Sequence, residues 1–343
     1  MSRRFRRADS RVRRSTRRHL TGLLAAVALA FSLVTSAAAA EEDLASVQSW
    51  LDRMAVAVNN LTYRGTLIYV RDARVDALKI LRRVDESGMR ERLVALNGSP
   101  REVLRDNDTV RCIFPDSQSI LVDTRIAERL FPAIASDASG LTSGQYSFKF
   151  AGTDRIAQMD AKVIVISPRD EFRYGYKLWL EPNTGMLLKS MLQDGTGRPL
   201  EQLMFTEIEI GATIRDRDLL PDVPGDGFVQ VEMPNATQTT DEPLKSQWSV
   251  GKLPAGFQLT SHRYGDQRSM EHMVFTDGLA SVSVYVERAG GDGEALTGAS
   301  RMGAVNMFGH TRDDVSITAV GEVPADTVKM MVNSVRQKAA VSQ

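Results

Sequence analysis

The spacing of apolar positions predicts one helix followed by a long series of strands. In residues 43–60 apolar side chains recur every three or four positions, which places them on one face of an amphipathic helix. These side chains are Leu44, Val47, Leu51, Met54 and Val58. Asp43 is a suitable N-cap. From Thr62 to about residue 211, short β-branched and apolar runs alternate with turn residues, which is typical of successive strands.

Turn sequences between these runs predict hairpins. Residues 85–88 and residues 106–108 each separate two strand-like runs. The clearest hairpin is predicted over residues 174–190. Its turn, Glu181-Pro182-Asn183-Thr184-Gly185, combines a proline of fixed φ with a glycine that accepts positive φ. Residues 123–158 are less regular, with a short helix predicted before Pro132 and a loop over Ala135–Gly144.

The composition changes at residues 221–245, which contain four prolines, two glycines and a polar run, as linkers do. Residues 246–338 then predict a smaller domain that ends in a helix beginning at Pro324, with Val328, Met331, Val332 and Val335 on one side. Its strands are predicted at Ala280–Glu287, Ala304–Phe308 and Val315–Val320. The expected fold class is therefore mainly β with α, with a large N-terminal antiparallel β domain over residues 41–220, a linker, and a C-terminal α+β domain. So long a sheet is expected to curl around its helix or around a ligand.

The first 40 residues have the pattern of an export signal. Nine arginines and one acid in residues 2–19 precede an apolar run from Leu20 to Val34, and small residues follow up to Ala40. We expect cleavage near Ala40 and a periplasmic location. A retained membrane anchor and a basic tail that binds nucleic acid are the alternatives. The apolar run has about 15 residues, whereas a spanning helix needs roughly 20.

Removal of this segment makes the protein acidic. The whole chain has 43 basic and 43 acidic residues. Loss of nine arginines and Asp9 leaves 34 and 42, a net charge near −8. Because binding to phosphate backbones requires a basic surface, nucleic acid is not an expected partner.

The sequence lacks the common catalytic and metal-binding motifs. His262, His272 and His310 remain after cleavage, and none is spaced for shared metal ligation. No nucleophile elbow or phosphate-binding loop occurs. We therefore expect no enzyme activity, no metal and no cofactor, although a carboxylate pair assembled in space would escape this search. Cys112, the single cysteine, is predicted to be buried in a strand; a reactive thiol or an interchain bridge is the alternative.

A curled sheet with a helix on its concave side either fills its interior or leaves an apolar cavity. Each buried methylene contributes roughly 0.8 kcal/mol, so an acyl chain of about 12 methylenes gains on the order of 10 kcal/mol before ordering costs. Tyr176, Leu178 and Trp179 are the candidates for such a lipid pocket. The alternative is that these side chains form ordinary core.

Several segments resemble one known family when their order and spacing are taken together. They are Tyr63-Arg64-Gly65-Thr66, residues 99–103 followed by Cys112, residues 174–190, Gly303-Ala304-Val305-Asn306, and residues 319–324 with the final helix. This pattern resembles the MucB/RseB family of periplasmic sigma-E regulators over nearly all of residues 43–338.

The resemblance implies a fold and a role. The N-terminal domain is expected to be similar to the lipoprotein carriers LolA and LolB, an unclosed β-barrel with a helical plug. The protein is expected to bind the periplasmic segment of a membrane-spanning anti-sigma factor, RseA or MucA, and to shield it from the first protease of a cascade. Lipid or lipopolysaccharide is expected to release it.

The residues that would contact this partner are sought in the C-terminal domain. Arg263, Tyr264 and Arg301 are the candidates, because they suit acidic or aromatic side chains of a partner. A periplasmic lipid or lipoprotein carrier of the LolA/LolB type is the alternative function, and a hydrolase with a scattered site is a third. The sequence leaves the oligomeric state open, including a homo-oligomer.

Overall fold

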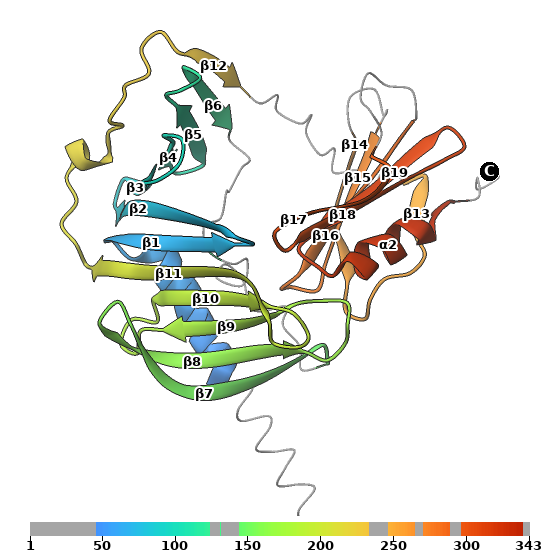
Figure 1. The fold of residues 1–343 in the computed structure, drawn as a ribbon, viewed down its shortest axis with the longest axis horizontal. Coiled ribbons are helices and arrows are strands. Elements are labelled where there is room, and N and C mark those ends of the chain that lie inside the picture. The colour runs from blue at the N-terminus through green and yellow to red at the C-terminus, as the bar shows by residue number, and fades with distance from the viewer. Residues whose placement is uncertain are drawn as a thin grey trace, which may run out of the picture. The chain divides into compact units, whose positions relative to one another are not determined.

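The computed structural model describes residues 46–123, 131, 144–232, 246–264, 270–288 and 296–338. Val47–Gln343 forms one compact unit, which contains both of the main sheets (Figure 1). The expected export signal, the short helix before Pro132 and nearly all of the Ala135–Gly144 loop lie outside the described residues.

A twelve-stranded sheet forms the larger part of the described chain. Its strand order is β12-β6-β5-β4-β3-β2-β1-β11-β10-β9-β8-β7, so the end strands do not pair with each other and the sheet does not close into a barrel. The strands are β1 (Tyr63–Arg71), β2 (Arg74–Asp85), β3 (Gly88–Ala95), β4 (Glu102–Asp106), β5 (Thr109–Phe114), β6 (Ser119–Asp123), β7 (Tyr146–Ile156), β8 (Met159–Pro168), β9 (Gly175–Leu180), β10 (Leu187–Gln193), β11 (Pro199–Ile210) and β12 (Val229–Glu232).

The first helix, described over residues 46–60, packs against this sheet and is drawn behind β8 to β11 in Figure 1. Leu51 and Met54 have no exposed surface and share one core with Leu178 and Phe205 of the strands. The predicted apolar face of the helix is thus the face that is buried. Each such side chain contributes roughly 1.5–3 kcal/mol on burial, so the helix is held mainly by tertiary packing.

The predicted hairpin over residues 174–190 is confirmed as β9 and β10, with Leu178 opposite Ser190 and Trp179 opposite Lys189. Gly185 in its turn has φ of +81°, and an added Cβ would lie 3.1 Å from Arg53 of the first helix. Both the backbone conformation and the close approach of the helix therefore favour glycine at this position.

One long strand lies where the sequence predicts less regular structure. β7 occupies part of the stretch predicted to be irregular, and β8 follows it directly. Apolar and polar residues alternate over Tyr146–Phe150, but the second half of β7 is exposed, with a polar run from Thr153 to Arg155, and lacks that alternation. Pairing with β8 along most of its length holds it in the sheet.

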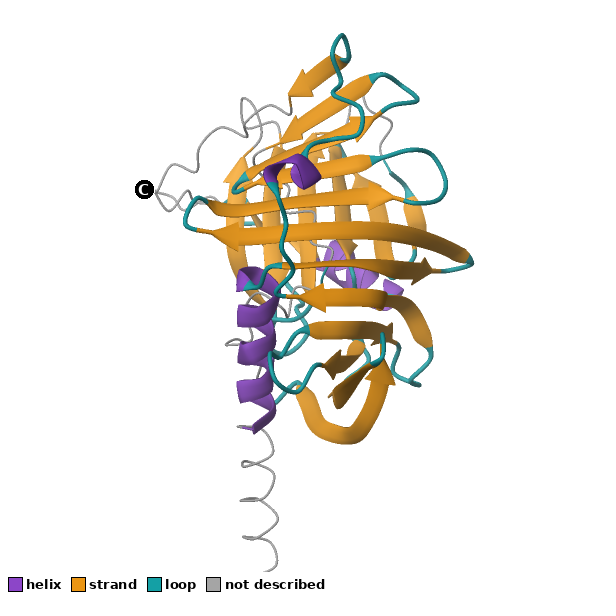
Figure 2. Ribbon diagram, turned by 90° about the vertical axis from the view of Figure 1, so that its left-hand side faces the viewer, coloured by secondary structure: helices purple, strands orange, loops and turns teal. Residues whose placement is uncertain are grey.

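The segment that joins β11 to β12, residues 211–228, is here called the strap. It contains a short 3-10 helix, η2 (Asp216–Leu219), and crosses one face of the twelve-stranded sheet (Figure 2). Arg83 donates to the carbonyl oxygen of Ile214 at 3.1 Å and pairs with Asp216 at 2.6 Å. β12 then pairs in parallel with β6. The stretch interpreted as a linker thus begins with residues that are bound to the sheet.

A buried ion pair anchors the far end of the strap. Arg92 pairs with Glu102 at 2.8 Å, and the two side chains are 10% and 7% exposed. The same guanidinium reaches Asp222 of the strap at 2.7 Å, and the Asp222 amide donates to Glu102 at 3.0 Å.

Replacing Arg92 with methionine is expected to lower the free energy of unfolding by about 3 kcal/mol, because Glu102 would remain buried without its cation. Urea denaturation measures this loss. The control is Arg111→Met, at an exposed arginine on β5 of the same sheet, which should change stability by less than about 0.5 kcal/mol. Equal effects of the two substitutions would contradict the assignment of Arg92 as the anchor.

A six-stranded sheet and a helix form the rest of the described chain. The strand order is β14-β15-β16-β19-β18-β17. These strands are β14 (Gln258–Tyr264), β15 (Met270–Thr276), β16 (Ser281–Arg288), β17 (Gly298–Met302), β18 (Val305–Arg312) and β19 (Val315–Gly321); β13 (Trp248–Val250) and β20 (Val335–Gln337) form a separate pair.

The final helix, α2 (Ala325–Ser334), packs its buried face on this sheet through Val328, Met331 and Val332, as predicted. Pro324 stands at the N-cap rather than at the first helical position. Val335, expected on the same helical face, instead begins β20 and is buried there.

Candidate functional site

The two sheets contact each other through a set of polar side chains that we call the junction. Its most buried member is Arg173, whose side chain is 0% exposed. The guanidinium pairs with the buried carboxylate of Asp277, in the β15–β16 turn, and donates to the Ala255 carbonyl oxygen at 2.6 Å. Asp170 accepts from it at 2.9 Å.

Asp277 is held from both sides of the junction. Its Oδ2 accepts from the Tyr146 hydroxyl of β7 at 2.9 Å, and its Oδ1 accepts from the amides of Leu279 and Ala280 at 2.9 and 2.8 Å. Burial and the neighbouring Asp277 carboxylate raise the pKa of Tyr146, so its hydroxyl stays a donor. Every oxygen of this carboxylate therefore has a partner, as a buried charge requires.

A second group of contacts holds the tip of the β17–β18 hairpin. The amide of Gly303 donates to Asp72 at 3.1 Å, and the amide of Ala304 donates to Glu201 of β11 at 2.8 Å. Gly303 has φ of +61°, and a Cβ there would lie 2.3 Å from the Arg71 side chain. A glycine at this tip allows the backbone to approach the twelve-stranded sheet closely.

A third contact joins Glu322, directly after β19, to Tyr176 of β9, with 2.8 Å between the carboxylate and the hydroxyl. Burial raises the pKa of Glu322 to about 7, and the charge of Glu201 acts in the same direction. The hydrogen bond from Tyr176 opposes them. The pKa of Tyr176 itself is raised by burial, so this phenol remains protonated.

The three lipid-pocket candidates of the sequence are all buried. Leu178 has no exposed surface, and Trp179 is 2% exposed. Trp179 donates from its indole nitrogen to Asp154 at 2.9 Å, with Lys177 and Lys189 within 5 Å of its ring. Tyr176 belongs to the junction. All three side chains belong to the buried core that also contains the apolar face of the first helix.

The three partner-binding candidates lie at opposite edges of the six-stranded sheet. Arg263 and Tyr264 are on the edge strand β14, and Arg301 is on the other edge strand, β17. Arg263 is exposed. Arg301 pairs with Asp72 at 3.2 Å and donates to the Gly303 carbonyl oxygen at 2.6 Å. The structure therefore does not bring these residues together, and it assigns Arg301 to the junction.

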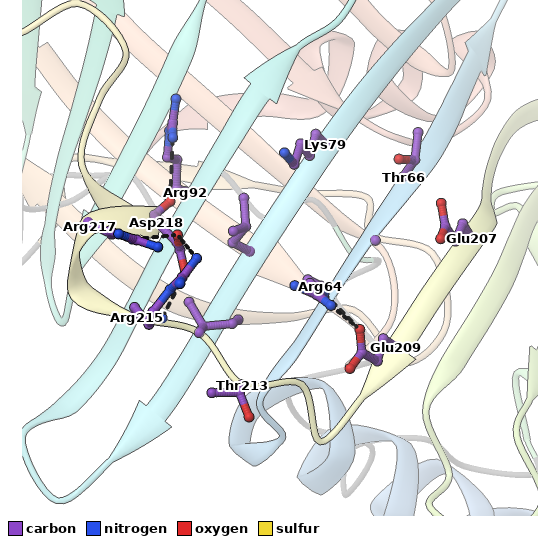
Figure 3. A pocket seen from close by; sticks show the side chains of 13 residues that line it. Arg64, Thr66, Lys79, Arg92, Glu207, Glu209, Thr213, Arg215, Arg217 and Asp218 are labelled. Atoms are coloured by element: carbon purple, nitrogen blue, oxygen red, sulfur yellow. Dashed lines mark hydrogen bonds and ion pairs between the residues drawn. The ribbon is translucent and has the colours of Figure 1, made fainter.

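A pocket of about 480 Å³ lies between the strap and the face of β1, β2 and β11 (Figure 3). Among its lining residues Arg64 pairs with Glu209 at 2.6 Å, and Arg215 pairs with Asp218 at 3.1 Å. Lys79 points into the same space. The pocket is thus polar, and much of its charge is compensated internally.

Cys112 is buried in the small cluster of Val103 and Val110, as the strand pattern predicted. In the described part of the chain, no cluster of three or more His, Cys, Asp or Glu side chains is arranged to hold a metal ion. No helix among the same residues combines the length and apolar character needed to cross a membrane.

Tyr176 and Arg301 of the junction are sequence candidates for other roles, and its remaining charged residues were not found from the sequence. Arg173, Asp277 and Glu201 look like ordinary surface charges in the sequence. Glu322 is the single charged residue in the stretch Ala319-Val320-Gly321-Glu322-Val323, which weakly indicates that its carboxylate has a partner in the folded chain. An acid within an apolar run is seldom buried unless it has a partner, and that partner lies 146 residues away.

Comparison with known proteins gives a consistent result over both sheets. The model of the MucB/RseB N-terminal domain matches residues 46–223, and the model of the MucB/RseB C-terminal domain matches residues 242–336. The sigma factor AlgU regulatory protein MucB of Pseudomonas aeruginosa is 32% identical, over 87% of this chain and 93% of its own. The sigma-E factor regulatory protein RseB of Haemophilus influenzae is 26% identical, over 90% of this chain and 96% of its own.

Solved structures agree with these relatives. A complex of Pseudomonas aeruginosa MucA and MucB contains a chain that is 30% identical, with a TM-score of 0.65, covering 86% of this chain and 100% of that one. A structure of MucB with MucA(peri) gives 29% identity and the same TM-score, over 85% of this chain and 99% of that one. The two family models together account for most of the sequence, and the chain therefore belongs to the MucB/RseB family of sigma factor regulatory proteins.

Proposed function

We propose that this protein is a periplasmic negative regulator of an envelope-stress sigma factor. It binds the periplasmic segment of a membrane-spanning anti-sigma factor of the RseA/MucA kind and shields that segment from the first protease of the release cascade. It transforms no substrate. Binding of lipid or lipopolysaccharide favours the unbound form and exposes the segment.

One observation carries this proposal. The relatives that match the chain along most of its length are sigma factor regulatory proteins, and two of the similar structures are complexes with MucA. The match covers both sheets rather than one, which supports a binding mode that uses both. Exposed edge strands and a polar pocket among the described residues also support the proposal, because such features suit recognition of another polypeptide.

A protection assay tests the shielding role. The periplasmic fragment of the anti-sigma factor is incubated with its site-1 protease, with and without the purified protein, and the intact fragment is quantified. We expect cleavage to slow at least tenfold when the protein is in excess. A cleavage rate that does not depend on the protein would overturn the proposal.

Arg263 is exposed on the edge strand β14, and it is the candidate contact whose substitution we test, since Arg301 is engaged at the junction. Arg263→Glu is expected to weaken binding of the anti-sigma fragment about tenfold, because it reverses a charge on an exposed sheet edge. Isothermal titration calorimetry measures the change. Arg288→Glu, at an exposed arginine that ends the internal strand β16, serves as the charge-matched control. Equal losses for both variants would remove Arg263 from the binding surface.

Release by lipid is tested on the preformed complex. Lipopolysaccharide or a lysophospholipid is added to the bound anti-sigma fragment, and the free fragment is separated by size-exclusion chromatography. The ligand can shift the equilibrium only if its affinity differs between the two states. We expect the free fraction to rise with ligand concentration. A complex that stays intact at saturating lipid would contradict this part of the proposal.

A further inference from the structure

Two carboxylates of the junction lie on opposite sides of the contact between the sheets. Glu322 directly follows β19 of the six-stranded sheet, and Glu201 lies in β11 of the twelve-stranded sheet. Glu201 accepts from the Tyr69 hydroxyl and, at 2.8 Å, from the Ala304 amide. Glu322 accepts from Tyr176, a residue that is 5% exposed. The charge of Glu322 also acts on Tyr69 and the charge of Glu201 acts on Tyr176, so the two acids interact across the closed junction.

The other titratable groups around this space are mainly phenols. Burial raises the pKa of Tyr69, Tyr174 and Tyr176, so all three stay neutral over the physiological range. Two arginines oppose this rise: Arg71 lowers the pKa of Tyr69, and Arg301 lowers the pKa of Tyr174. For Glu322 itself, the hydrogen bond from Tyr176 lowers the pKa and the charge of Glu201 raises it. Asp194 also raises the pKa of Tyr174, and Tyr146 raises that of Tyr176.

From this arrangement we propose that Glu322 acts as a proton-dependent latch between the two sheets. With its carboxyl protonated, the side chain is neutral, shares a hydrogen bond with Tyr176 and faces Glu201 without repulsion. With its carboxylate ionised, a charge is confined in a partly buried space beside a second carboxylate. The junction is tightest in acid and loosens as the medium becomes alkaline.

The direction follows from proton linkage. The pKa of Glu322 rises from 4.5 to about 7 in the folded, closed state. A closed junction therefore binds a proton more tightly than an open one. Protonation of Glu322 therefore stabilises the closed junction fully below pH 4.5. This stabilisation decreases as the pH rises above 4.5 and is lost as the pH rises through about 7.

The test uses the full chain and four variants, with the thermal unfolding midpoint measured across mildly acid to mildly alkaline pH. We expect the midpoint of the native protein to fall with an inflection near pH 7. Glu322→Gln should abolish that inflection. Glu287→Gln, at an exposed carboxylate of the same sheet, should retain it. Circular dichroism in acid confirms that each variant is folded.

Two further variants separate a titrating latch from a merely structural contact. Tyr176→Phe removes the hydrogen bond that favours the ionised form, so the inflection should move to higher pH. Glu201→Gln removes the repelling charge but keeps an acceptor for Ala304, so the inflection should move to lower pH. Shifts in the same direction, or an inflection that survives in Glu322→Gln, would overturn the latch.

Discussion

Replacing Arg173 with methionine is expected to lower the free energy of unfolding by about 3–5 kcal/mol, the largest effect that we predict for a charged residue in this chain. The substitution keeps most of the side-chain volume but removes the cation from Asp277, whose side chain is 1% exposed. It also leaves the Ala255 carbonyl oxygen without its donor. Urea denaturation followed by circular dichroism measures the loss.

A double-substitution cycle distinguishes the ion pair from a packing defect. Arg173→Met combined with Asp277→Asn removes both charges, so the double variant should be more stable than the sum of the two single losses implies. Arg198→Met, at a 70% exposed arginine paired with Asp194, should change stability by less than about 1 kcal/mol. Strict additivity in the cycle would show that Arg173 and Asp277 do not depend on each other.

Leu178→Ala is expected to lower the free energy of unfolding by about 2–5 kcal/mol, because it removes fully buried methyl groups from the core beneath the first helix. The size of the loss within that range reports how far the helix can settle into the space. Thermal or urea unfolding measures it. Leu96→Ala makes the same chemical change at a side chain that is 51% exposed, and should cost less than about 1 kcal/mol. A loss at Leu178 as small as that at Leu96 would show that the first helix does not depend on this contact.

The elements set by local pattern could be predicted from the sequence. The first helix was recognisable from the spacing of Val47, Leu51 and Met54, and those side chains are buried. The β9–β10 hairpin was recognisable from a turn whose Pro182 and Gly185 have defined backbone requirements. The buried face of α2 followed from the same kind of spacing. In each case the signal lies within one element.

Features that depend on distant parts of the chain could not be predicted. β7 is polar along half its length and is held by pairing with β8. β12 lies in a proline-rich stretch that resembles a linker, and its parallel partner β6 ends more than 100 residues earlier. The position of Arg301 at the opposite sheet edge from Arg263 depends on strand order, which composition does not encode.

The junction could not be predicted from the sequence for the same reason. Its members come from six or more elements and meet only in the folded chain, so no motif marks Arg173 or Asp277 in the sequence. The family resemblance, in contrast, was visible because it rests on the order of several short segments. The sequence therefore indicated the kind of protein before it indicated which of its residues hold the two sheets together.

The most direct test of the proposed function is the affinity of the purified protein for the periplasmic segment of the anti-sigma factor from the same organism. Calorimetric titration should give a one-to-one complex with a dissociation constant on the order of 1 μM or lower, equivalent to at least about 8 kcal/mol. Absence of binding at concentrations well above that value, with both components folded, would contradict the account.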